Sequence, residues 1–177
     1  MSLAGLWRPE SRQSCVVWDK AASRSRLLVA RPLVVDTTGF VAAIRQASAP
    51  FFEAVLSGRI WLSAIVTCEL YAGTRSTQES RLLDLLVRGA IARERFLAPV
   101  GDDWIMAGRL LARRVRLQGA LQPRDHLADV LIVVSAARIA GEIATANRGH
   151  FEAWAKMARR AGLDVIVGGV DIDPSRR

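Results

Sequence analysis

Three acidic residues stand in apolar surroundings where a charged side chain is costly to place. Asp36 follows the run Leu-Val-Val, Glu69 lies inside Ala-Ile-Val-Thr-Cys-Glu-Leu-Tyr-Ala, and Asp129 interrupts Leu-Ala-Asp-Val-Leu-Ile-Val-Val. An ionised carboxylate that is buried without partners is strongly destabilised, so each acid needs a compensating charge. Taken singly, each also has an ordinary explanation: Asp36 as a helix cap, Glu69 reaching solvent, and Asp129 facing an arginine.

Taken together, the three acids indicate a site for a divalent cation. Open parallel sheets bind ligands at the carboxyl ends of their strands, and Asp36 and the segment around Thr145 both follow short apolar runs of the kind that form buried strands. Converging carboxylates would be neutralised by Mg²⁺ or Mn²⁺, which prefer hard oxygen ligands. The sequence therefore predicts a magnesium or manganese site at one edge of a sheet.

The elements that must position these acids follow one another closely. Short apolar runs rich in β-branched residues predict strands at residues 33–36, 60–63, 95–100, 143–145 and 163–167. Helical spacing and capping signals predict helices between them, reaching about residue 57 and then spanning about 64–71, 76–91, 102–117, 126–140 and 151–161, with Asp102 able to cap the fourth of these. Strands alternating with helices favour a three-layer α/β/α fold with a central, mostly parallel five-stranded sheet.

Residues 32–168 are expected to form one domain, with an N-terminal extension at residues 1–31 and a tail at 169–177. The extension shows neither helical nor strand periodicity. It is interpreted as a disordered basic arm, as a partner-binding segment anchored by Trp7 and Trp18, or as the product of a start codon assigned too early.

Composition restricts the function classes. The chain has 25 Lys and Arg against 17 Asp and Glu, a balance that favours RNA, DNA or an acidic partner. Cys15 and Cys68 lack the spacing of a zinc site or a disulfide framework, and Cys68 is expected to be a small buried residue. No apolar run reaches the roughly 18 residues that span a bilayer, so we expect a cytoplasmic protein without a membrane partner.

Four segments resemble, in order, the successive motifs of PIN-domain proteins. They are Val-Val-Asp-Thr-Thr-Gly-Phe at 34–40, Ser-Ala-Ile-Val-Thr-Cys-Glu-Leu-Tyr-Ala-Gly at 63–73, Asp-Val-Leu-Ile at 129–132 and Thr-Ala-Asn-Arg-Gly-His-Phe at 145–151. Within that family the pattern is most similar to VapC, the ribonuclease toxin of bacterial toxin–antitoxin pairs. The resemblance implies a PIN-like fold, a metal-dependent endoribonuclease that uses Mg²⁺ or Mn²⁺, an RNA substrate, a VapB-like antitoxin and a homodimer.

The resemblance also implies roles for individual residues. Asp36, Glu69 and Asp129 match the family's catalytic acids, and Asp36 and Asp129 its metal ligands. Thr37 or Thr38 matches a hydroxyl residue beside the first acid, and Asn147 a polar position after the fourth strand. These polar residues are expected to order the site.

The sequence departs from the family pattern at His150, where an aspartate usually precedes the phenylalanine. This replacement removes a negative charge and offers nitrogen where Mg²⁺ prefers oxygen, so we expect weaker metal binding. Asp125 lies four residues before Asp129 and is a candidate to replace the missing acid if both share one helical face. His126, just before Leu127, is interpreted as an exposed residue at the start of the helix.

Arg124 and Arg148 flank the segments of Asp129 and Asn147, and they are the candidate phosphate contacts, although a generally basic surface explains them equally well. Two alternatives to the nuclease stay open. The first is a PIN-like protein that binds RNA or a partner but is catalytically impaired, as His150 suggests. The second is a basic DNA-binding regulator, which requires a recognition helix that the sequence does not indicate.

Overall fold

The computed structural model describes residues 31–169 of the 177-residue chain. The interpretations of the N-terminal extension up to residue 30, with Trp7, Cys15 and Trp18, lie outside the described residues. The proposed boundaries at 31/32 and 168/169 stay predictions.

The sheet has five strands, and all of their pairings are parallel. The strands are β1 (Leu33–Val35), β2 (Ile60–Ser63), β3 (Phe96–Leu97), β4 (Glu142–Ala144) and β5 (Ile166–Gly168), in the order β3-β2-β1-β4-β5. Val34 of β1 lies opposite Trp61 on one side and Ile143 on the other. Because the chain runs outward from β1 first through β2 and later through β4, the carboxyl end of β1 is the switch point of the sheet, where open α/β folds bind ligands.

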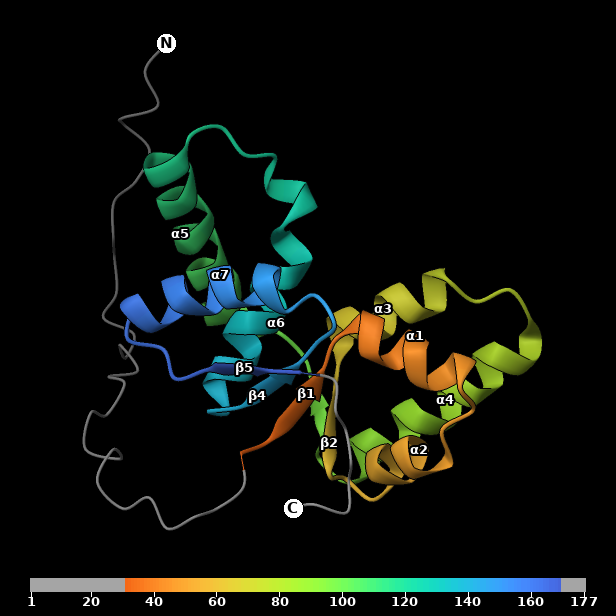
Figure 1. Cartoon of the computed structure of the whole chain (residues 1–177). Coiled ribbons are helices and arrows are strands. Elements are labelled where there is room, and N and C mark those ends of the chain that lie inside the picture. Colours follow the sequence, from red (N-terminus) through yellow and green to blue (C-terminus); the bar gives the residue numbers. More distant parts are fainter. Residues whose placement is uncertain (1–30, 170–177) are drawn as a thin grey trace, which may run out of the picture.

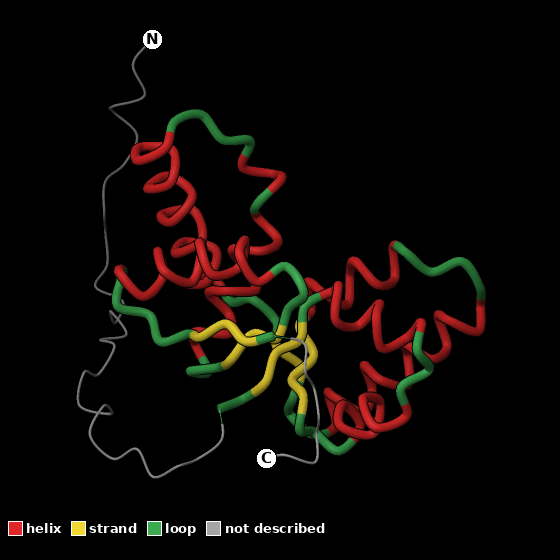
Figure 2. Tube along the Cα trace, viewed as in Figure 1, coloured by secondary structure: helices red, strands yellow, loops and turns green. Residues whose placement is uncertain are grey.

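Helices cover the sheet on both sides, as Figures 1 and 2 show. One side carries α1 (Thr37–Arg45), α2 (Ala49–Leu56), α3 (Ala64–Ala72) and α4 (Thr77–Ala92), and the other carries α5 (Gly101–Gln118), α6 (Leu127–Arg138) and α7 (Arg148–Arg160). The predicted three-layer α/β/α fold is therefore confirmed. Between residues 31 and 169, no helix has both the length and the apolar character needed to cross a bilayer.

The core lies on both faces of the sheet. Val34, Val35 and Ile143 are fully buried in its central strands, and Phe40 of α1 is equally buried. Helix α6 is buried along all of residues 130–137, which explains why its sequence is apolar in every direction rather than on one stripe. Asp129 therefore lies in the first turn of α6, directly before its buried stretch.

Several predicted boundaries were wrong for local reasons. The expected helix up to residue 57 is two helices, because Ala47 has a left-handed φ of 48° and Pro50 is best accommodated in the first turn of a new helix. Strand β3 has two residues instead of six. Helix α5 begins one residue earlier than expected, with Val100 at its N-cap position, and its acidic cap is Asp103 instead of Asp102: the Asp103 carboxylate accepts the backbone N–H of Val100 at 3.0 Å.

Asp103 is also the centre of a buried ion pair between α5 and α6. Its carboxylate is 3% exposed, lies 3.1 Å from Nε of Arg138 and accepts a hydrogen bond from Ser135 at 3.4 Å. We expect Asp103→Ala to lower the free energy of unfolding by about 3 kcal/mol, because the Arg138 charge loses its partner and α5 loses its cap. Denaturant unfolding measures this difference. The exposed neighbour Asp102 is the control, and its replacement by alanine is expected to change stability by less than about 0.5 kcal/mol; equal effects of the two substitutions would refute the assignment.

Candidate functional site

Asp36 is held at the switch point of the sheet by hydrogen bonds. Its backbone N–H donates to the carbonyl of Ala144 at 3.1 Å, and its side chain caps α1 by accepting the N–H of Gly39 at 3.0 Å. The hydroxyls of Thr38 and Thr145 donate to the same carboxylate at 2.8 Å and 2.7 Å. The side chain is almost fully buried, so these donors supply the compensation that its negative charge requires.

The two threonines also order the loop that follows β4. The hydroxyl oxygen of Thr38 accepts the N–H of Ala146 at 3.3 Å, and that of Thr145 accepts the N–H of Asn147 at 2.9 Å. The structure thus joins the end of β1 to the start of α7 through side-chain hydroxyls. Thr38 contacts Asp36 directly, whereas Asn147 is connected to it only through its backbone N–H and Thr145.

Glu69 lies on the exposed side of α3, where the hydroxyl of Thr37 donates to its carboxylate. Both residues line a cavity of about 360 Å³ whose other walls come from α1, the end of α3 and α4. The walls are mostly apolar, with charged side chains at several positions, and they include Val41, Ile44, Arg45, Leu70, Arg75, Glu79, Leu82 and Leu83. Glu69 therefore lies in the wall of a cavity whose lining is both apolar and charged.

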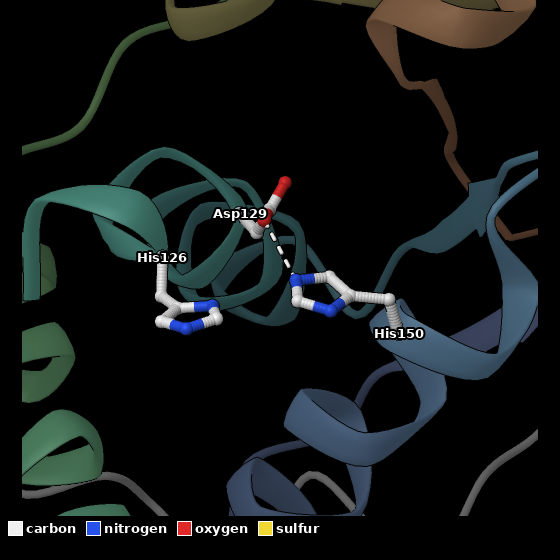
Figure 3. Close-up of side chains that lie close together, drawn as sticks. All are labelled: His126, Asp129 and His150. Atoms are coloured by element: carbon white, nitrogen blue, oxygen red, sulfur yellow. Dashed lines mark hydrogen bonds and ion pairs between the residues drawn. The ribbon is translucent and has the colours of Figure 1, made fainter. Parts of the chain in front are cut away.

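Asp129 forms a cluster with two histidines, drawn in Figure 3. Its Oδ2 lies 2.8 Å from Nε2 of His150, and the imidazole rings of His126 and His150 are stacked with centroids 5.5 Å apart and planes 21° apart. One potential ligand atom from each of these three residues lies within 4.8 Å of the other two. Within residues 31–169, no other group of three or more histidine, cysteine, aspartate or glutamate side chains approaches so closely.

The three predicted acids have different neighbours in the structure. Asp36 is bonded between β1 and β4, Glu69 lies at the α3 cavity, and Asp129 meets the histidines. A set of two imidazole nitrogens and one carboxylate suits zinc-type ions and differs from the all-oxygen set that Mg²⁺ prefers. The cluster could hold a metal ion, but its donor set does not fit the magnesium ion that the sequence indicated. The assignment of Asp36 and Asp129 to one ion stays a prediction.

His126 is the residue that sequence reasoning missed. Instead of being an exposed residue, it is half-buried, with its ring also against Trp154 at a centroid distance of 5.6 Å. The available signal was its position directly before the helix that carries Asp129, which keeps the two side chains close in the chain.

Two further expectations failed on local structure. Asp125 belongs to the short 3₁₀ turn η2 (Pro123–Asp125), not to α6, so the helical spacing that would have placed it beside Asp129 was wrong. Its exposed carboxylate lies 3.5 Å from Nε of Arg124 instead. Cys68, expected to be buried, is exposed.

Basic side chains gather at a second cavity, of about 330 Å³, between α5 and α7. Arg114, Lys156 and Arg160 line it, and Gly149, next to His150, lies at its margin. The predicted phosphate contacts Arg124 and Arg148 are both exposed, and neither lines this cavity. Sequence order alone did not reveal these three basic residues as a group, because Arg114 of α5 is more than 40 positions away from Lys156 and Arg160 of α7.

No protein-family model and no curated protein sequence matches the chain. The fold is similar to that of a chain in DNA-bound VapBC from Salmonella typhimurium, with a TM-score of 0.55 and 22% identity, covering 79% of this chain and 98% of that one. FitAB bound to a DNA fragment gives a TM-score of 0.54 at 17% identity, covering 78% and 94%; FitAcB from Neisseria gonorrhoeae gives 0.53 at 18%, covering 78% and 97%. The chain therefore has the α/β fold of these complexes, and the predicted resemblance to VapC-like PIN domains is confirmed at the level of the fold.

Proposed function

We propose that the protein is a metal-dependent endoribonuclease and the toxin component of a type II toxin–antitoxin pair similar to VapBC. The observation that carries the proposal is the buried carboxylate of Asp36 at the switch point of a sheet whose fold matches a chain of VapBC. A short segment links it to the metal cluster: Thr145, which donates to Asp36, is five residues before His150, which contacts Asp129.

In this proposal Asp36, Glu69 and Asp129 are the catalytic acids, and Thr37, Thr38 and Asn147 hold them in place. A bound divalent ion supplies Lewis acidity toward the scissile phosphate and toward an attacking water. The fixed carboxylate of Asp36 contributes negative charge at the sheet edge, and Glu69 is exposed enough to accept a proton. Mg²⁺ or Mn²⁺ as the ion shared by Asp36 and Asp129 remains part of this proposal.

An RNA substrate is supported by charge. The chain carries a formal net charge of +8, and Arg114, Lys156 and Arg160 concentrate part of it at the cavity between α5 and α7. Phosphate contacts of this kind dominate the affinity of basic proteins for nucleic acids. Arg124 and Arg148 are exposed and available to extend the same surface toward the cluster.

An antitoxin of the VapB type is the proposed partner, because the similar structures of VapBC and FitAB are themselves complexes. The cavity beside Glu69, with its apolar walls, is a suitable place for a partner segment that covers the catalytic acids. A homodimer of the toxin is proposed on the resemblance alone.

The test compares the native chain with Asp36→Asn on structured RNA, with Mg²⁺, Mn²⁺ or a chelator present. We expect cleavage by the native protein that stops with chelator and falls by roughly a hundredfold or more in the variant, because asparagine removes the charge while keeping the shape. Thermal unfolding confirms that the variant is folded. Equal cleavage by the two proteins, or cleavage that chelator leaves unchanged, would remove the assignment.

The contact between His150 and Asp129 favours a second candidate, a PIN-like protein that binds RNA or a partner with little hydrolysis. If the imidazole in place of an acid is the cause, His150→Asp is expected to increase metal-dependent cleavage over that of the native chain. A variant no more active than the native chain would exclude that explanation.

A further inference from the structure

The two histidines of the chain both lie beside Asp129, although they are 24 positions apart in the sequence. His126 directly precedes α6, and His150 lies in the first turn of α7. Figure 3 shows the two rings side by side, each presenting a nitrogen toward the space between them and Asp129. Packing of α6 against α7 thus creates one cluster with two nitrogen donors and one carboxylate.

His126 carries a polar atom that the protein does not satisfy. Its Nδ1 is buried and has no hydrogen-bond partner among the described residues. Leaving such an atom unpaired costs about 1–3 kcal/mol. Trp154 packs against the ring and restricts its orientation, so the nitrogen is held beside Asp129 and His150 instead of turning to solvent.

The spacing of the donor atoms is close to that of a tetrahedral metal site. Zinc–nitrogen and zinc–oxygen bonds of about 2.0–2.1 Å place neighbouring ligand atoms about 3.4 Å apart. The contact between His150 and Asp129 is 2.8 Å, and every pair of the cluster lies within 4.8 Å. Small side-chain rotations therefore suffice to bring all three atoms to bonding distance.

We propose that His126, Asp129 and His150 bind a zinc-type divalent ion as a site of two histidines and one carboxylate. Imidazole nitrogen suits Zn²⁺, Co²⁺ and Ni²⁺, whereas Mg²⁺ requires oxygen donors in near-ideal octahedral geometry. Three protein ligands leave a fourth position of a tetrahedral ion open to water or to a phosphate oxygen, as in catalytic zinc sites. The site shares Asp129 with the proposed nuclease centre but does not depend on RNA cleavage.

The test follows the two imidazoles of the full chain by nitrogen NMR while Zn²⁺ or Mg²⁺ is added. Because the chain has two histidines, the imidazole region of the spectrum contains the signals of these two side chains alone. We expect one equivalent of Zn²⁺ to shift both signals and the same amount of Mg²⁺ to shift neither. The measurement is repeated on the Cys15→Ser/Cys68→Ser variant, since thiols also bind Zn²⁺ and Cys68 is exposed. Unchanged imidazole signals with Zn²⁺ in either protein would overturn the proposal.

Zinc affinity is then measured by competition with a chromophoric chelator. His126→Gln and His150→Gln are each expected to weaken binding by roughly a hundredfold, because each removes one of three ligands. The matched control is Asp102→Asn, which removes an exposed acid on α5 and is expected to bind as the native chain does. Unaltered affinity in both histidine variants would show that the ion binds elsewhere.

These outcomes separate this inference from the proposed function. If Zn²⁺ binds at the histidines but the chain does not cleave RNA, the zinc site is supported and the nuclease proposal is refuted. If the chain cleaves RNA with Mg²⁺ but its imidazole signals do not shift with Zn²⁺, the nuclease proposal is supported and the zinc site is refuted. Asp36→Asn is expected to keep the zinc-induced shifts while losing cleavage, since Asp36 is not a member of the cluster.

Discussion

Replacing Asp129 with asparagine is expected to reduce RNA cleavage by roughly a thousandfold and to abolish stoichiometric zinc binding, the largest functional effect of any single substitution in this chain. Asp129 supplies the one carboxylate of the cluster within residues 31–169. Asparagine keeps the volume and one oxygen but leaves two imidazoles with no negative charge between them. The loss of the metal's charge stabilisation, several kcal/mol, corresponds to this factor.

The measurement is the cleavage rate of structured RNA under single-turnover conditions, together with the zinc competition assay on the same preparations. Asp102→Asn again serves as the control, because it removes the same charge from an exposed position. If Asp129→Asn cuts RNA at the native rate, Asp129 has no catalytic role. If it cuts slowly but binds zinc normally, Asp129 acts on RNA without being a ligand.

The largest effect on stability is expected for Phe40→Ala, which should lower the free energy of unfolding by about 3–5 kcal/mol. Phe40 is fully buried on α1, and its ring meets that of Phe51 edge-to-face at a centroid distance of 4.9 Å, so it joins α1 to α2. Because a domain of this size is stable by only about 5–15 kcal/mol, the loss is a large share of the total.

Urea unfolding followed by tryptophan fluorescence measures this change. Leu85→Ala on α4 is the control: its side chain is 52% exposed, and we expect a change of less than about 1 kcal/mol. A loss below 1 kcal/mol for Phe40→Ala would mean that α1 does not pack as described. Since Asp36 caps α1, a loosened α1 is also expected to disturb the hydrogen bonds of Asp36.

Of the three acids only Asp36 is buried, whereas Asp129 is half-buried and Glu69 is exposed, so the expected cost of burial applies fully to Asp36 alone. A buried carboxylate requires partners, but these need not be a cation. Asp36 obtains hydrogen bonds from Thr38, Thr145 and the backbone of Gly39. Thr145 is 109 positions away from Asp36 in the chain, so no local sequence pattern predicts their hydrogen bond.

Asp129 was likewise located by a local pattern, but its contacts were not predicted from it. A run of apolar residues around an acid indicated that the position is special, and the first position of the Asp-Val-Leu-Ile motif located it on a helix. Its partner His150 was noticed only as a departure from the family pattern, while His126 was judged by its position at a helix start. Which side chains turn toward Asp129 depends on how α6 packs against α7 and on the ring of Trp154 behind His126.

The sequence by itself determined the order of strands and helices, the parallel sheet and the placement of Asp36 at the end of its first strand, because apolar periodicity and capping are local properties. The tertiary structure decided the rest. It gave Asp36, Glu69 and Asp129 different neighbours, and it brought two histidines to Asp129. The physical reason is that a hydrogen bond or a metal site needs its atoms to be close in space. That closeness depends on how whole helices pack and is not encoded in any single segment.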